Sequence, residues 1–357
     1  MNILFVIPSM HCGGAERVMS ILCNSFSSKG DNVFLCITED ATDIMYPLSD
    51  KVQIVNLTCS GSSYVYKIPQ YIRGIYDIVK RIKADIVVSF ITRTNIYSVL
   101  ACKAAGVPVI VSERNNPMTI PANRHLRILR NYVYRYADGI VFQTKYARDY
   151  YCEKIRRKST IIKNPCEYSE IVVPYQNKED IIVSACRLVP QKNVSLLIEA
   201  FSLIKDKIPS YKLYIYGDGS LKNDIERQIT TNNLQDRVIM KGVDFDLITK
   251  MSKCKIFALP SNFEGLSNSL AEALCTGAAC IATDSPTFGN REIIIDGENG
   301  ILTPVGDVNR FADGLFRLTT DMAFANSLSK EAIKIRNSIS VSKITSEWQM
   351  YMQEIMK

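Results

Sequence analysis

Short apolar runs rich in β-branched residues alternate along the chain with segments that have helical periodicity. The runs of the first half are NILFVI (2–7), NVFLCIT (32–38), DIVVSF (85–90), VPVIVS (107–112) and GIVFQT (139–144). Those of the second half are DIIVSA (180–185), YKLYIYG (211–217), VIMKG (238–242), KIFALP (255–260) and AACIAT (278–283). Strands that alternate with helices form parallel sheets with crossover helices, so the pattern predicts an α/β fold.

The alternation breaks once, after Lys163, where NPCEYSEIVVPYQNKED (164–180) combines two prolines with mixed charge. We place the linker there and expect an N-terminal domain at 1–168 and a C-terminal domain at 169–340. A last helix at 341–357 can cross back to the N-terminal domain. We expect both domains to be doubly wound and Rossmann-like, and to face each other across a cleft at the carboxyl ends of their sheets, where such folds bind ligands.

The composition excludes several classes of protein. The chain has 357 residues, no apolar stretch that could span a membrane and no signal peptide in its opening MNILFVIPSM, so we expect a cytoplasmic protein. Eleven cysteines are scattered without a C-x-x-C pair, which is typical of buried thiols in a reducing compartment. With only His11 and His125, neither a Ser-His-Asp triad nor a multi-histidine metal site is expected.

The positive charge is concentrated in the first half of the chain. Residues 1–172 carry 22 lysines and arginines against 14 acidic residues, whereas residues 173–357 carry 21 against 22. Such asymmetry indicates an anionic partner for the first domain, either a nucleic acid or an acidic membrane surface.

The segment HCGGAER (11–17) joins the first predicted strand to a helix. Gly13 and Gly14 let the backbone approach an anion at the start of that helix. The G-x-G-x-x-G fingerprint of dinucleotide-binding folds is incomplete here, so a plain tight turn explains the glycines as well as a ligand loop does.

Two further segments place charged residues at strand ends of the second half. In ACRLVPQKN (185–193), Arg187 and Lys192 can bind a diphosphate, although on their own they could equally be solvated surface cations. In NFEGLSNSLAEAL (262–274), Glu264 and Glu272 lie eight residues apart around a predicted helix start, on nearly the same face, where they can bind sugar hydroxyls. The backbone N–H groups that can dock an anion at this start belong to Gly265, Leu266, Ser267 and Asn268.

The order of these motifs resembles glycosyltransferase family 4, the retaining nucleotide-sugar-dependent enzymes of the GT-B fold. The resemblance rests on GGAER (13–17), RLVPQKN (187–193), YGDGS (216–220), FEGLSNSLAEAL (263–274) and DGENGILTPVGD (296–307), and it covers nearly the whole chain. It implies that Glu264 contacts the donor sugar, that Glu272 holds the nucleotide ribose, and that Arg187 and Lys192 bind the diphosphate.

The resemblance also implies roles for the glycine loops and for the segment after the fourth N-terminal strand. Gly217 and Gly14 would lie at the donor, and Gly13 at the acceptor or its phosphate. The family often carries a histidine after that strand, where this chain has VSERNNP (111–117) and offers Glu113 or Arg114 instead. The same segment is similar in a subgroup that acts on bacterial surface polysaccharides, which favours lipid-linked acceptors.

The expected reaction follows from this resemblance and from the negative charge that develops on the leaving diphosphate. A hexose or N-acetylhexosamine would pass from a nucleoside-diphosphate sugar, most simply a UDP-sugar, to a glycan linked to polyprenyl diphosphate. Cations and helix N-termini would stabilise the leaving diphosphate, so neither a metal nor a cofactor is expected, and Asp244-Phe245-Asp246 is interpreted as a helix N-cap rather than a D-x-D metal site. The alternatives are a nucleotide-sugar epimerase or phosphorylase of the same fold, and a noncatalytic nucleotide-sugar-binding protein.

A basic helix is predicted within NRHLRILRNYVYRY (123–136). Arg124, Arg127 and Arg130 recur every three residues among apolar and aromatic residues, which suits a helix that lies on an anionic membrane or binds a lipid diphosphate. An ordinary packed helix with a basic outer face explains the pattern equally well. Nucleic acid is less favoured, because no recognised binding motif accompanies the charge. We therefore expect a peripheral protein at the inner face of the plasma membrane.

Overall fold

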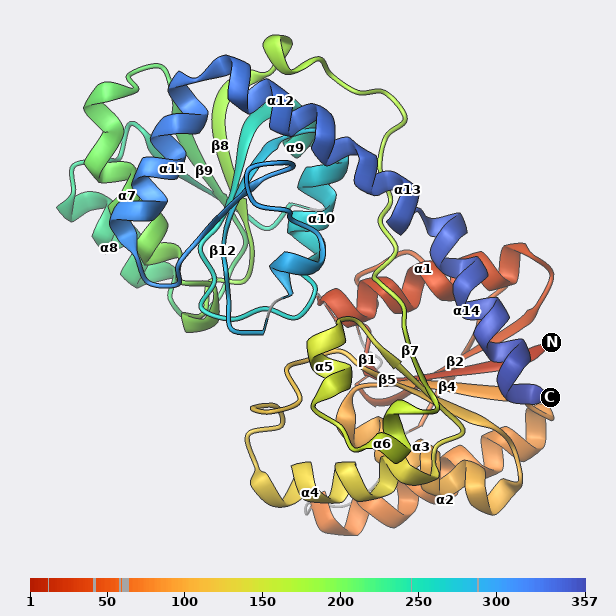
Figure 1. Cartoon of the computed structure of the whole chain (residues 1–357). Helices are drawn as coiled ribbons and strands as arrows, with labels where there is room; N and C mark the ends of the chain where they lie inside the picture. Colours follow the sequence, from red (N-terminus) through yellow and green to blue (C-terminus); the bar gives the residue numbers. More distant parts are fainter. Residues whose placement is uncertain (12, 41–42, 58, 60–63, 245, 288) are drawn as a thin grey trace. The chain divides into compact units, whose positions relative to one another are not determined.

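The computed structural model describes residues 1–11, 13–40, 43–57, 59, 64–244, 246–287 and 289–357. The chain folds into two compact units, one comprising Met1–Pro165 with Ser340–Lys357 and the other Cys166–Ile339 (Figure 1). Each unit is built around a parallel sheet with helices on both faces, so the α/β class predicted from the alternation is confirmed.

The sheet of the first unit has the strand order β3-β2-β1-β4-β5-β6-β7, all pairs being parallel. The strands are β1 (Asn2–Ser9), β2 (Asn32–Asp40), β3 (Gln53–Asn56), β4 (Ile86–Phe90), β5 (Val109–Glu113), β6 (Gly139–Phe142) and β7 (Ser159–Ile161). The apolar runs predicted five of these. The edge strands β3 and β7 were missed because they are short and lack a buried residue, so they carry little hydrophobic signal.

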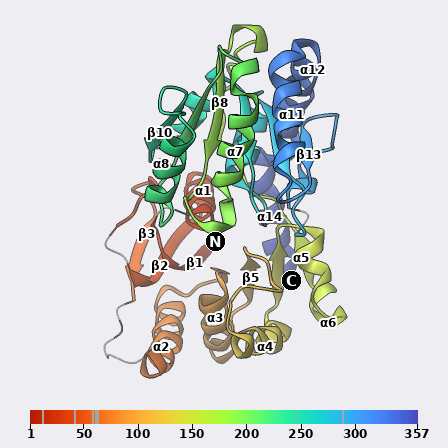
Figure 2. The same ribbon diagram turned by 90° about the vertical axis from the view of Figure 1, so that its left-hand side faces the viewer.

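Helices cover both faces of this first sheet. Figures 1 and 2 show α2 (Tyr64–Ile82), α3 (Thr92–Ala105) and α4 (Arg124–Val133) on one face, and α1 (Gly14–Ser28) with α14 (Val341–Met356) on the other. The short helices α5 (Lys145–Asp149) and α6 (Glu153–Arg156) lie between β6 and β7 in sequence. No helix of the described residues has the length and apolar character that crossing a bilayer requires.

The last helix, α14, belongs to the first unit although it follows the second in sequence. Trp348 is fully buried there, with its ring centroid 6.0 Å from that of Phe90 in β4. The Tyr351 hydroxyl accepts the backbone N–H of Ile140 at 2.9 Å and donates to the carbonyl of Lys158 at 2.7 Å. Apolar packing and these hydrogen bonds therefore fix the C-terminus to the N-terminal sheet.

The sheet of the second unit has the order β10-β9-β8-β11-β12-β13, again with parallel pairs. Its strands are β8 (Glu179–Ala185), β9 (Lys212–Tyr216), β10 (Val238–Gly242), β11 (Cys254–Leu259), β12 (Ala279–Thr283) and β13 (Ile301–Thr303). The helices α7 (Val194–Ile204), α8 (Lys222–Thr231) and α11 (Val308–Thr320) cover one face, and α9 (Leu247–Lys253) with α10 (Asn268–Cys275) covers the other (Figure 1). The chain then passes through α12 (Met322–Ala332) and α13 (Arg336–Ile339).

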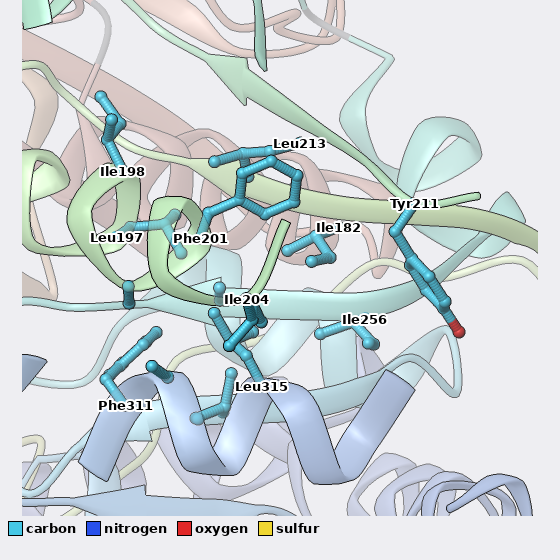
Figure 3. Packing of buried hydrophobic residues seen from close by; sticks show 14 of the residues in the cluster. Ile182, Leu197, Ile198, Phe201, Ile204, Tyr211, Leu213, Ile256, Phe311 and Leu315 are labelled. Atoms are coloured by element: carbon cyan, nitrogen blue, oxygen red, sulfur yellow. The ribbon is translucent and has the colours of Figure 1, made fainter. Parts of the chain in front are cut away.

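One apolar layer holds α7 and α11 against the second sheet. Phe201 of α7 packs over Leu213 and Ile182 of the strands, with Leu315 of α11 beside them (Figure 3). Each such fully buried side chain stabilises the fold by about 1.5–3 kcal/mol. This packing leaves the loops at the carboxyl ends of β8, β9 and β11 on one edge of a rigid sheet.

Candidate active site

The loops that follow β8 and β9 are hydrogen-bonded to each other. Leu188 N–H donates to the carbonyl of Asp218 at 2.8 Å, and Leu221 N–H donates back to the carbonyl of Leu188 at 2.9 Å. Gly217 has φ +128°, and a side chain there would overlap the carbonyl oxygen of Cys186. Only glycine fits this position, because two loops approach each other closely here. The donor-binding role expected of Gly217 stays a prediction.

The loop after β8 is also joined to the loop that precedes α10. Asn262 N–H donates to the carbonyl of Gln191 at 2.8 Å, and the Gln191 side chain donates to the carbonyl of Phe263 at 3.0 Å. The side chain of Asn193 donates to that of Asn262 at 3.0 Å. Two segments about 70 residues apart in sequence thus form one rigid surface at the sheet edge.

Lys192 and Glu264, both predicted site residues, meet on this surface. The Lys192 Nζ lies 2.5 Å from Oε1 of Glu264, and the side chains are only 12% and 6% exposed. An ammonium has three donors, and the bond to Glu264 uses one of them. Arg187 is exposed at the end of β8, in the same loop. The arrangement offers an oriented cation and carboxylate to a ligand that has both anionic and hydroxyl groups.

Backbone contacts hold Glu264 in place. Its N–H donates to Oγ1 of Thr287 at 3.1 Å, and the Thr287 hydroxyl donates to the Glu264 carbonyl. A side chain at Gly289 would overlap the carbonyl oxygen of Gly265. The sequence did not predict a role for Thr287 or Gly289, because a threonine and a glycine after a buried strand form no distinctive motif.

Glu272 lies inside α10, whereas Glu264 precedes it. The helix begins at Asn268, and the Ser267 hydroxyl accepts the N–H of Leu270 at 3.5 Å as its N-cap. Glu264 thus lies before the helix, where the sequence analysis placed it, and the expectation that the two carboxylates lie on nearly the same face stays a prediction. The position of Glu264 comes from Lys192 and Thr287. Glu272 is 3% exposed, so this helix does bury an acid, as its apolar neighbours predicted.

The D-x-D sequence lies at the start of α9. The Asp244 carboxylate accepts the N–H of Asp246 at 2.8 Å, and Asp246 is the N-cap residue, although its side chain makes no capping hydrogen bond. Phe245 is outside the described residues. Asp244 thus uses its carboxylate in a local turn that precedes the helix.

In the first unit, adjacent residues at the end of β5 point to opposite faces of the sheet. Glu113 is 1% exposed and accepts hydrogen bonds from the hydroxyls of Tyr151 at 3.0 Å and Tyr134 at 3.4 Å. Its Oε2 is 3.5 Å from Nη1 of Arg130 in α4. Burial raises the pKa of Glu113, and Arg130 and the two hydroxyls oppose that rise. The Glu113 carboxylate is thus enclosed by Tyr134, Tyr151 and Arg130, and its predicted role at the acceptor or its phosphate stays a prediction.

Arg114 lies on the other face, towards α1. It is 8% exposed, its Nη2 donates to Asn164 Oδ1 at 2.8 Å, and its guanidinium carbon is 4.4 Å from the centroid of the Phe90 ring. Burial lowers the pKa of Arg114 to about 9, and the Glu16 carboxylate in the first turn of α1 acts in the opposite direction. Of the two candidates after β5, Arg114 is the one that interacts electrostatically with Glu16 of α1.

The basic face predicted for α4 is corrected. Arg130 is fully buried, because it donates to the carbonyls of Ile120 and Pro117, each at 2.8 Å, in addition to pairing with Glu113. Arg127 Nη1 donates to the carbonyl of Pro121 at 2.7 Å, and Arg124 is exposed. The exposed side of the helix and the turn after it is largely apolar and aromatic, and comprises Ile128, Leu129, Tyr132 and Tyr136.

Comparisons with known proteins agree with this geometry. A family model described as Glycosyltransferase Family 4 matches residues 12–169, and one described as Glycosyl transferases group 1 matches residues 170–335. The chain is 26% identical to the GalNAc-α-(1→4)-GalNAc-α-(1→3)-diNAcBac-PP-undecaprenol α-1,4-N-acetyl-D-galactosaminyltransferase of Campylobacter jejuni, over 99% of each chain. It is 28% identical to the UDP-Gal:α-D-GlcNAc-diphosphoundecaprenol α-1,3-galactosyltransferase of Escherichia coli, over 83% of this chain and 82% of that one.

Solved structures show the same fold. A crystal structure of Anabaena HepE in complex with UDP superposes with a TM-score of 0.83 at 17% identity, covering 99% of this chain and 100% of that one. A glycosyltransferase from Rickettsia africae gives a TM-score of 0.83 at 17% identity, covering 100% and 98%. The chain therefore belongs to the family 4 glycosyltransferases and has the GT-B fold, with a Glycosyltransferase Family 4 region followed by a group 1 glycosyl transferase region.

Proposed function

We propose that this protein transfers a hexose or N-acetylhexosamine from a UDP-sugar to a glycan linked to polyprenyl diphosphate, with retention of anomeric configuration and without a metal ion. The observation that carries the proposal is the largely buried pair of Lys192 and Glu264 at the carboxyl edge of the second sheet. The relatives from Campylobacter and Escherichia, named for undecaprenol-linked acceptors, support the choice of acceptor, and the second also supports the donor. The proposed setting is the assembly of bacterial surface polysaccharide.

The proposed reaction breaks the bond between the anomeric carbon and the β-phosphate oxygen of the donor. Positive charge develops on the sugar ring and negative charge on the departing diphosphate, which Lys192 and Arg187 stabilise. Glu264 accepts hydrogen bonds from the sugar hydroxyls, and Glu272 from the ribose. The acceptor hydroxyl bonds to the anomeric carbon on the face that the phosphate leaves, and its proton passes to that phosphate, so no protein base is required.

Lys192 and Arg187 also support metal independence. A divalent ion usually neutralises a leaving diphosphate, and here two cations on one loop supply that charge. The backbone N–H groups at Gly265 to Asn268 add partial positive charge at the start of α10. We therefore expect transfer to persist when EDTA is present.

The test is sugar transfer into lipid, followed by mass spectrometry, with purified protein, EDTA, a panel of UDP-, GDP- and ADP-sugars, and polyprenyl-diphosphate-linked acceptors. Lys192→Met should lower the rate by about 10²-fold or more. Lys255→Met is the matched control, because Lys255 is also 12% exposed and pairs with Asp180 at 2.5 Å, near the amino ends of β11 and β8. Equal losses in both variants, or no transfer from any donor by folded protein, would contradict the proposal.

We further propose that the exposed side of α4 docks on the anionic inner face of the plasma membrane. Ile128 and Tyr132 are 57% and 55% exposed, and Arg124 and Arg135 are exposed close to them in sequence. Apolar and aromatic side chains flanked by arginines are typical of helices that lie in a membrane interface. Ile128→Asp should weaken co-flotation with vesicles that contain phosphatidylglycerol, and Leu203→Asp, at a position 56% exposed on α7 of the second unit, should not. Equal flotation of both variants would refute this docking face.

A further inference from the structure

The segment 115–123, which leads from β5 to α4, folds back on itself. The backbone N–H of Met118 donates to the side-chain oxygen of Asn116 at 3.0 Å, and the N–H of Ile120 donates to the Asn116 carbonyl at 2.9 Å. At the start of the segment, the backbone N–H of Asn115 donates to the buried Glu113 carboxylate. The segment is therefore a defined turn at the carboxyl end of β5 and not an open connection.

Two arginines of α4 hold the backbone carbonyls of this segment. Arg127 Nη1 donates to the carbonyls of Pro121 at 2.7 Å and Ala122 at 2.8 Å. The carbonyl of Thr119 lies 3.4 Å from the same nitrogen, and Arg130 donates to two more carbonyls of the segment. A guanidinium presents its N–H donors in a rigid plane, so one side chain can fix several carbonyls at once. The segment is thus anchored along its length by side chains of the helix that follows it.

The side of the segment that the arginines do not hold faces solvent. Asn115 and Thr119 are exposed, and Met118 is 50% exposed. An amide and a hydroxyl both donate and accept hydrogen bonds, as the hydroxyls of a sugar do. The segment lies beyond the carboxyl end of a strand, which is where open α/β sheets bind their ligands. A loop that is fixed before binding spares its ligand the entropic cost of ordering it.

We propose that segment 115–123 is a preorganised recognition loop for the terminal sugar of the acceptor, and that Arg127 is the positioning residue that holds it. Asn115 and Thr119 bind the sugar hydroxyls, whereas Arg127 does not touch the acceptor and acts through the loop carbonyls. Without Arg127 the acceptor has to order the loop as it binds, so its affinity falls while the chemical step is unchanged. This inference rests on the proposed function, because it assigns the loop to the acceptor of that reaction.

The first experiment compares the kinetics of wild-type protein and Arg127→Met, with a UDP-sugar as donor and N-acetylhexosamines linked to water-soluble farnesyl diphosphate as acceptors. The KM for the acceptor should rise about tenfold, while kcat and the KM for the donor should stay within about twofold. Asn115→Ala removes a proposed sugar contact and no carbonyl anchor, and it should also raise the acceptor KM. A purely structural defect would instead lower kcat or raise both KM values together.

Arg237→Met is the matched control. Arg237 also donates to backbone carbonyls, those of Tyr211 at 2.9 Å and Ile208 at 2.8 Å, but it does so at the amino end of β9 in the second unit. This variant loses the same kind of hydrogen bond far from the proposed loop in sequence, and should leave the acceptor KM at the wild-type value.

Hydrogen exchange followed by mass spectrometry tests the loop without turnover. Peptides that contain the amides of Met118 and Ile120 should exchange about tenfold faster in Arg127→Met than in wild type, and at the wild-type rate in Arg237→Met. Equal exchange in wild type and Arg127→Met, or an unchanged acceptor KM in that variant, would overturn the inference. No transfer by folded wild-type protein would count against the proposed function, and the acceptor role of the loop would fall with it.

Discussion

The buried pair of Glu113 and Arg130 gives the sharpest prediction about stability. Both side chains are 0% exposed, and Arg130 also satisfies two carbonyls of the segment before α4. Replacement of Arg130 by methionine keeps an apolar stem of similar length but leaves the Glu113 carboxylate buried without its cation. Breaking a buried ion pair in this way costs about 3–5 kcal/mol of unfolding free energy.

The cost should depend on pH with a definite sign. Burial raises the pKa of Glu113 above its ordinary value of 4.5, and Arg130 lowers it, so the methionine variant should raise it further. A carboxyl with a raised pKa in the folded state favours folding when it is protonated and loses that contribution as pH rises through the folded-state pKa. The penalty of Arg130→Met should therefore be largest at pH 8 and should shrink as the pH is lowered towards 5.

The assay is urea unfolding followed by tryptophan fluorescence. Trp348 is the only tryptophan of the chain and is buried in the first unit, so its emission reports on the unit that contains the pair. Arg124→Met is the control and should change stability by less than about 0.5 kcal/mol, because Arg124 is exposed. The reasoning is refuted if the penalty is the same at pH 5 and pH 8, or if adding Glu113→Gln to Arg130→Met recovers no stability.

Two more substitutions test the fold that positions the sites. Tyr351→Phe removes the hydroxyl that links α14 to the backbone of Ile140 and Lys158. It should lower the unfolding free energy of the first unit by about 1–3 kcal/mol in the same fluorescence assay. An unchanged urea midpoint would show that these hydrogen bonds do not stabilise the unit. Gly217→Ala places a methyl group against the Cys186 carbonyl at a φ of +128°, and should separate the loops after β8 and β9. UDP affinity is then measured by calorimetry. An affinity equal to that of the wild type would show that UDP binding does not depend on the close contact between these two loops.

The long strands and the second-unit site were predictable from sequence because their signals are local. Continuous apolar runs located the central strands of both sheets, and Lys192 and Glu264 were selected from motifs at strand ends. The sequence could not predict that Lys192 and Glu264 lie 2.5 Å apart, because this contact depends on the hydrogen bonds that join the Gln191 and Asn262 segments. The family resemblance supplied roles for these residues that spacing alone could not.

In the first unit, the prediction of a basic surface on α4 was wrong for Arg130, because this residue is buried. Arginines three apart in α4 indicated a basic surface, but Arg130 turns inward because Glu113 and two carbonyls satisfy it. Only the tertiary structure shows that Glu113 faces α4 and Arg114 faces α1, because the sequence does not show which face of β5 borders α1. The edge strand β13 of the second unit was also missed, because a strand of three residues has too few positions to show a pattern.

The central claim is that Glu264 takes part in sugar transfer without a metal. The most direct measurement compares wild-type protein with Glu264→Gln for transfer from a UDP-sugar to a polyprenyl-diphosphate-linked glycan in EDTA, with folding checked by circular dichroism. The account predicts transfer by the wild type and a loss of about 10²- to 10³-fold in the variant. Transfer that requires an added divalent ion, or a folded Glu264→Gln as active as wild type, would contradict it.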